Sequence, residues 1–165
     1  EAFASRANFY NITRNFAFIG IMAVGMVAVI VTGGIDLSVG SIMGLVGVVC
    51  GLLLPAGYPW WAVIVLALLS GAAVGLVNGA LIAYLGLSSF VVTLGMLSFA
   101  RSLAIVLSEN KILYDFGPGG PAFKAIGGGQ MFGLSNPVWV LIIITILTQR
   151  RPHGLFAQKG RAVES

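Results

Sequence analysis

The stretch VIVTGGIDLSVGSIMG, Val29–Gly44, decides how this chain folds. It places one carboxylate, Asp36, within an apolar run and directly after the Gly33, Gly34 and Ile35 positions. Glycine costs a helix about 1 kcal/mol relative to alanine, so the glycine pair weakens the helix there. Asp36 and Ser38 are both residue types that favour a helix N-cap. The stretch therefore predicts that one helix ends, the chain breaks, and a second helix begins beside the carboxylate, where its positive end stabilises an anion.

The composition is that of a membrane protein. The chain has 165 residues, of which 58% are hydrophobic and 8% are charged, with a mean hydropathy of +1.01. A soluble domain carries about 25% charged residues. Between Arg14 and Arg101, Asp36 is the only formally charged side chain. These values predict an all-α, polytopic bundle of transmembrane helices whose main surroundings are the lipid bilayer.

Apolar segments long enough to cross a bilayer, about 20 residues, mark the expected spans. We expect four full spans and a partial fifth in one transmembrane domain, residues 1–148. The spans are predicted at 16–35, 38–54, 60–84, 90–107 and 138–148. The charged and glycine-rich residues 108–137 are predicted to form an extramembrane loop with a short surface helix. Residues 149–165 read as a basic tail, which the distribution of charge places weakly on the cytoplasmic side.

Small and polar residues within the spans predict contacts between helices. Gly71, Gly75 and Gly79 recur every four residues, and such a face lets helix backbones approach closely in lipid. Asn78 is an intramembrane amide that can bond across helices. Arg101 either extends its charge to the membrane surface or pairs with Asp36.

Several classes of function are not supported by the residues present. The net charge of +4 comes from basic residues at the ends and in loops, so no nucleic-acid partner is expected. No GxxxxGK[ST] motif occurs, so ATP should not bind to this chain by that device. His153 is the only histidine, and neither a metal cluster nor a Ser–His–Asp arrangement is expected. The chain is therefore not expected to be an enzyme.

Three stretches carry a resemblance to a known family. They are TGGIDLSVGS at Thr32–Ser41, GALI at Gly79–Ile82, and SSFVVTLGMLSFARSLAIVL at Ser88–Leu107. The chain resembles, over about residues 8–147, the permease subunits of bacterial ABC importers for sugars of the ribose type. The first of these motifs is long and specific.

The resemblance implies a multi-pass protein of the bacterial inner membrane that works as a homo- or heterodimer of permease chains. It implies a passage for a monosaccharide such as ribose, xylose or galactose. A periplasmic sugar-binding protein would deliver the sugar, and a cytoplasmic ATPase subunit would bind the ATP, so this chain would hold no cofactor. The residues expected to shape the passage are those of the break, namely Gly33, Gly34, Asp36, Ser38 and Gly40.

Both ends of the chain depart from the family pattern. Full-length members of the resembled family are longer and have more spans, and by this resemblance we expect the family's first span to be missing here. QRRPHGLFAQKGRAVES, residues 149–165, does not match the segment that couples to the ATPase, and a frameshift or a premature stop is our hypothesis. Two other functions stay open: an ion-coupled secondary transporter, which also uses broken helices, and a remnant that transports nothing. A purely capping role for Asp36 at the membrane edge also stays open.

Overall fold

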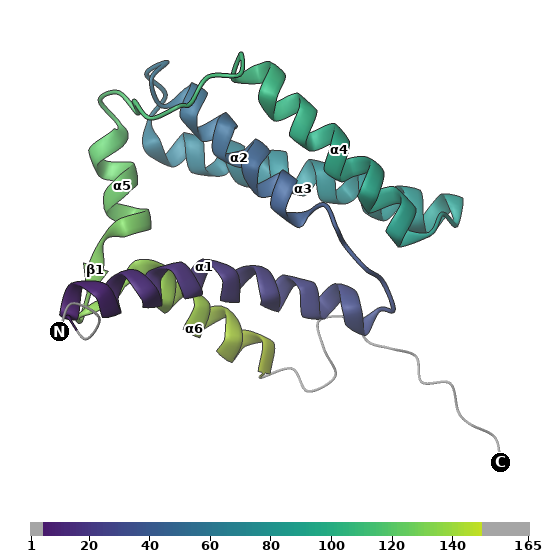
Figure 1. The fold of residues 1–165 in the computed structure, drawn as a ribbon, viewed down its shortest axis with the longest axis horizontal. Helices are drawn as coiled ribbons and strands as arrows, with labels where there is room; N and C mark the ends of the chain where they lie inside the picture. The colour runs from purple at the N-terminus through teal and green to yellow at the C-terminus, as the bar shows by residue number, and fades with distance from the viewer. Residues whose placement is uncertain (1–4, 150–165) are drawn as a thin grey trace. The chain divides into compact units, whose positions relative to one another are not determined.

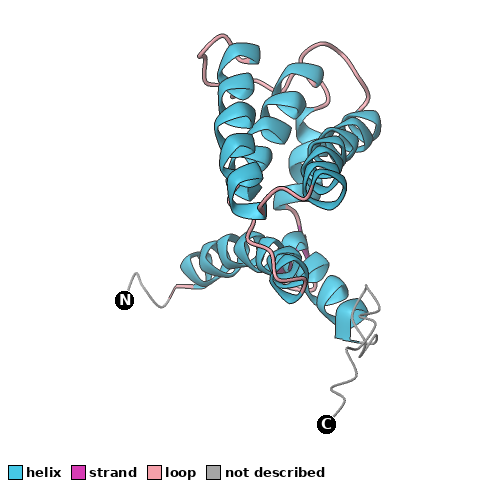
Figure 2. Cartoon of the chain, turned by 90° about the vertical axis from the view of Figure 1, so that its right-hand side faces the viewer, coloured by secondary structure: helices cyan, strands magenta, loops and turns pink. Residues whose placement is uncertain are grey.

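The computed structural model describes residues 5–149, which are almost entirely helical (Figure 2). This confirms the predicted all-α class. The one departure is a two-stranded antiparallel hairpin, in which Gln130 faces Ser135 and Met131 faces Leu134. The elements in chain order are α1 (Arg6–Val31), α2 (Val39–Leu53), α3 (Trp60–Leu85), α4 (Ser89–Leu107), α5 (Gly120–Gly128), β1 (Gln130–Met131), β2 (Leu134–Ser135) and α6 (Asn136–Gln149).

Three helices are long and apolar enough to cross a membrane: Asn8–Val31 within α1, α3 and α4. The apolar helices α2 and α6 are shorter. At 1.5 Å per residue, the 15 residues of α2 extend about 22 Å, which is less than the hydrocarbon thickness of about 30 Å. The second of the four predicted full spans is therefore a short helix, as is the partial fifth.

The first helix differs from the predicted span 16–35 at both ends. It begins at Arg6, because the Ser5 hydroxyl caps it by accepting a bond from the Asn8 backbone N–H at 3.2 Å. It continues through Arg14, since a charge near one end does not prevent helical geometry. The helix ends at Val31, before the glycine pair, as the break requires.

The described residues form two compact units, which we describe separately. The first contains α1, the hairpin and α6, with α1 and α6 lying side by side (Figure 1). Gly20 permits this approach, because a Cβ placed there would lie 2.7 Å from Leu141 Cδ2. The Tyr10 hydroxyl also donates a hydrogen bond to the Gly128 carbonyl at 2.8 Å.

The second unit contains α2, α3 and α4, which lie side by side, together with most of α5 (Figure 1). Its core consists of Cys50 and Leu54 from the end of α2, and Val63 and Ala67 from the start of α3. Two aromatic residues pack against this core: Phe116, in the loop between α4 and α5, and Phe123 of α5. The short helix expected within 108–137 is α5.

Most of the apolar surface of the long helices remains exposed. In the most apolar 18 residues of each candidate span, the fraction of the segment that is buried within the structure is 6% for α1, 11% for α3 and 22% for α4. Exposing so much apolar surface to water is energetically unfavourable, so these faces require contact with lipid or with other helices. The predicted tail, 149–165, lies outside the described residues except for Gln149, which ends α6.

Candidate functional site

A non-helical segment separates α1 from α2, as the opening motif predicts. The Thr32 hydroxyl ends α1 by donating to the Val29 carbonyl at 2.7 Å. Gly33 then takes a φ of +80°, in the left-handed region that side chains with a Cβ rarely adopt. Gly34 is not among the residues with positive φ. Of the two glycines, Gly33 is therefore the one whose backbone conformation requires glycine.

The Asp36 carboxylate binds the beginning of α2 through Ser38. Asp36 Oδ1 accepts one bond from the Ser38 backbone N–H at 2.8 Å and a second from the Ser38 hydroxyl at 2.6 Å. Ser38 is the N-cap residue, but its side chain caps no helix N–H; its hydroxyl donates to Asp36 and its oxygen accepts from Asn78 Nδ2. The arrangement is an Asx turn, in which an aspartate bonds the chain two residues ahead. It holds the carboxylate at the positive end of α2.

Asn78 connects this turn to the C-terminal third of α3. Its Nδ2 donates to the Ser38 hydroxyl oxygen at 3.1 Å, so that Asp36, Ser38 and Asn78 form one hydrogen-bonded chain. Ser38 is fully buried and Asn78 is 5% exposed. The Asn78 Oδ1 atom is buried and has no hydrogen-bond partner within residues 5–149. The network therefore has one unused acceptor. Burying an amide oxygen without a hydrogen-bond donor costs folding free energy.

The first turn of α4 holds the backbone of the break at Ile35. The Ser89 hydroxyl accepts a bond from the Ile35 N–H at 3.2 Å. The Thr93 hydroxyl shares its hydrogen between the Ser89 carbonyl, at 2.8 Å, and the Ile35 carbonyl, at 3.2 Å. Both polar groups of Ile35 thus find partners, which an interrupted backbone needs inside a membrane.

Sequence reasoning did not identify Ser89 and Thr93 as part of this site. The available signal is their spacing of four residues, which places two hydroxyls on one face at the start of an apolar helix. That signal is weak, because the hydroxyl of a residue such as Thr93 also bonds to its own helix.

Arg101 does not pair with Asp36. Across the described part of the chain, the ion pair present is Lys111 with Glu109, and the Asp36 carboxylate is occupied by Ser38. Arg101 instead lines a groove between α2 and α4 with a volume of about 490 Å³. Gly40 and Gly44 line the same groove. Arg101 and Asp36 are therefore not ion-pair partners, although the groove that Arg101 lines begins beside the break, at Leu37 and Gly40.

The glycine face of α3 is only partly used for packing. A Cβ placed on Gly71 would lie 3.4 Å from Val46 Cγ2, so at this position α3 packs closely on α2. Cβ atoms placed on Gly75 and Gly79 would meet nothing within 4 Å among the described residues. We propose that Gly75 and Gly79 instead contact a helix that is not among the described residues.

No metal centre is formed by the residues that the structure describes. Within 5–149 no group of three or more His, Cys, Asp or Glu side chains is placed to hold a metal ion. The Asp36 carboxylate instead accepts from Ser38, whose hydroxyl oxygen accepts from Asn78. These bonds hold the backbone and the side chains of the site in place.

Comparison with known proteins identifies transport permeases as relatives. Residues 8–150 match the family described as "Branched-chain amino acid transport system / permease component". The autoinducer 2 import system permease protein LsrD of Klebsiella pneumoniae is 38% identical over 152 residues, covering 90% of this chain and 44% of the relative. The ribose import permease protein RbsC of Haemophilus influenzae is 33% identical over 143 residues, covering 86% and 44%. The chain thus spans less than half the length of these relatives. No solved structure matches the chain.

Proposed function

Because the chain belongs to the family of branched-chain amino acid transport system permease components, we propose that it forms part of the membrane passage of an ATP-driven importer. The single observation that carries this proposal is the family match, which extends over residues 8–150. The family is one of multi-pass membrane permeases and not of enzymes. The three helices of membrane-spanning length are in keeping with that.

The substrate that we propose is a monosaccharide of the ribose type. A ribose import permease and an autoinducer 2 import permease are similar to this chain at 33% and 38% identity, which supports a small polar solute. Similarity at this level does not separate the two, so the uptake of both compounds has to be measured.

The proposed partners follow from the same assignment. They are a second permease chain, a cytoplasmic ATPase subunit that binds the ATP, and a periplasmic sugar-binding protein. We propose that residues 1–148 belong to one partial permease domain in the bacterial inner membrane. Residues 149–165 would then be a basic tail, and this chain would need no cofactor of its own.

Within this function, the break between α1 and α2 is the proposed element that shapes the passage. Gly33, Gly34, Asp36, Ser38 and Gly40 form or border it. Non-helical backbone in a membrane is tolerated where it is buried in protein or lines a water-filled cavity. The bonds from Ser38 to Asp36 and from Ser89 and Thr93 to Ile35 support a fixed break rather than a loose one.

The proposal is tested by uptake in bacterial cells that lack their own ribose and autoinducer 2 permeases but keep the matching ATPases and binding proteins. The expected result is uptake of labelled ribose that survives collapse of the ion gradients while ATP is maintained. Uptake that is lost with the ion gradients would assign the chain to ion-coupled transport. Stable membrane insertion without uptake of either compound would identify a chain that does not transport by itself.

A further inference from the structure

The groove between α2 and α4 has the chemistry of a site for an amphiphile. Its volume, about 490 Å³, lies within the usual range of small-molecule sites, about 300–1,000 Å³. The walls are mainly apolar, with Leu37 and Leu97 among the lining residues. The groove is open above Gly40 and Gly44, since a Cβ at either position would meet nothing within 4 Å. A single carboxylate side chain from another helix would not fill this space.

The polar groups of the groove are one cation and two hydroxyls whose hydrogens are already used. The Ser41 hydroxyl donates to the Ser38 carbonyl at 2.9 Å, and the Ser108 hydroxyl donates to the Ile105 carbonyl at 3.2 Å. The exposed Arg101 guanidinium has no ion-pair partner in the described part of the chain. A neutral sugar needs many hydrogen-bonding partners, whereas this groove supplies apolar walls and one positive charge.

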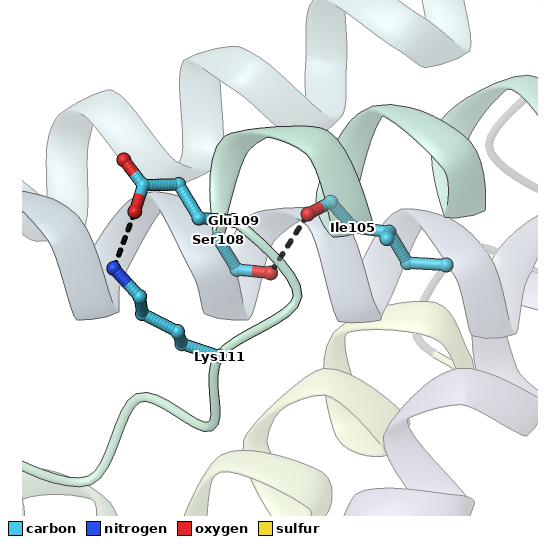
Figure 3. A network of polar contacts seen from close by, with 4 residues as sticks. All are labelled: Ile105, Ser108, Glu109 and Lys111. Atoms are coloured by element: carbon cyan, nitrogen blue, oxygen red, sulfur yellow. Dashed lines mark hydrogen bonds and ion pairs between the residues drawn. The ribbon is translucent and has the colours of Figure 1, made fainter.

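Arg101 lies near the polar end of its helix. It lies six positions before Leu107, the last residue of α4, which is about 9 Å along the axis. The turn that follows is polar, and in it the Lys111 ammonium pairs with the Glu109 carboxylate beside Ser108 (Figure 3). An arginine side chain can extend over most of that distance, so where the bilayer surface lies at this turn the charge would reach the headgroups while the stem stays among apolar groups.

We propose that this groove binds an anionic phospholipid. The guanidinium of Arg101 forms two parallel hydrogen bonds to the phosphate, a geometry for which arginine is well suited. One acyl chain lies along the apolar walls, over the backbone that Gly40 and Gly44 leave uncovered. Charge complementarity and the apolar lining together favour this ligand over a carboxylate or a sugar.

The test reconstitutes the full chain in phosphatidylcholine bilayers that contain trace spin-labelled phosphatidylglycerol or spin-labelled phosphatidylcholine. Electron spin resonance measures the fraction of each lipid whose motion the protein restricts. Wild type should prefer phosphatidylglycerol by about fivefold, the size expected for one basic residue near the headgroups. Arg101→Gln should reduce this preference to nearly one. Arg14→Gln removes a cation of α1, outside the groove, and should leave the preference unchanged.

A second pair of variants tests the space rather than the charge. Gly44→Leu fills the groove and should reduce the restricted fraction of both lipids. Gly47→Leu is the matched control on the same helix, since Gly47 also has free space but does not line the groove. Circular dichroism verifies that each variant keeps its helical content.

Three results would overturn the proposal. One is an unchanged preference for phosphatidylglycerol in Arg101→Gln. Another is an equal loss in Arg14→Gln, which would indicate general attraction to basic residues. The third is release of the lipid by millimolar ribose, which would assign the groove to the path of the sugar.

Discussion

Asn78 of α3 donates a hydrogen bond to the hydroxyl of Ser38 at 3.1 Å, although the two residues are 40 positions apart in the chain. The same hydroxyl donates its own hydrogen to Asp36. This bond therefore joins the C-terminal third of α3 to the beginning of α2, at the hydroxyl that also bonds the carboxylate of the break.

Removing both side chains of this bond should reveal a positive coupling energy. Ser38→Ala and Asn78→Ala should each destabilise the protein, and the double variant should lose less than the sum, by about 0.5–1.5 kcal/mol, as for other polar pairs between membrane helices. Unfolding with a denaturing detergent, followed by circular dichroism, measures the four free energies of the cycle. Strict additivity would show that the bond contributes nothing.

Adding a side chain at Gly33 should be far more costly than adding one at Gly34. Gly33 has a φ of +80°, and an L-residue held in the left-handed region costs about 1–2 kcal/mol. Gly33→Ala should therefore lower the free energy of unfolding by that amount. Gly34→Ala is the matched control and should be nearly neutral. Equal losses in the two variants would contradict the assignment of the turn conformation to Gly33.

The hydroxyl of Thr93 should matter through the hydrogen that it shares with the Ile35 carbonyl. Thr93→Val keeps the shape of this buried side chain but removes the donor, and should cost about 1 kcal/mol or more. Thr93→Ser keeps the hydroxyl and should recover most of that loss. Ser98→Ala, at an exposed position of the same helix, is the control. A valine variant as stable as the serine variant would argue against the bond.

Two glycines of α2 should respond oppositely to alanine. A Cβ at Gly51 would lie 2.9 Å from Leu113 Cβ, so Gly51→Ala should destabilise by about 1–3 kcal/mol through overpacking. Gly47 has nothing within 4 Å of such an atom, and Gly47→Ala should be neutral or stabilising because alanine favours helices. Thermal unfolding in detergent distinguishes these outcomes. A stable Gly51→Ala protein would mean that Leu113 moves aside.

The carboxyl of Glu109 should titrate below its ordinary pKa of 4.5. The hydrogen bond and the charge of Lys111 lower this pKa, and both groups are exposed. Because the folded pKa is lowered, the small stabilisation is present above the unfolded pKa and is lost as the pH falls through the folded one. Carbon-detected NMR of the labelled side chain measures the shift, and Lys111→Gln should raise the pKa again. An unchanged value in that variant would exclude Lys111 as the cause.

The sequence by itself determined the class of the protein and the position of its break. Apolar length and the scarcity of charge are local properties, and they led to an all-α membrane protein. The resemblance to permeases came instead from three specific motifs, of which Thr32–Ser41 is the most specific. The conformational cost of the glycine pair is likewise local, so the break and the beginning of α2 could be predicted from the residues, whereas α1 ends at Val31, four residues before the predicted span does. The start of α1 could not be predicted in this way, because the predicted span was counted from the first uncharged stretch after Arg14, whereas the helix begins at Arg6.

Only the tertiary structure decided which polar groups meet. The bonds from Asn78 to Ser38 and from Thr93 to Ile35 join residues 40 and 58 positions apart. They depend on how each helix is rotated about its own axis, and a nearly uniform apolar composition does not specify that rotation. The same rotation separates Arg101 from Asp36 and turns it toward the groove beside Gly44. Composition determined that these helices exist, and packing determined which of their polar groups meet.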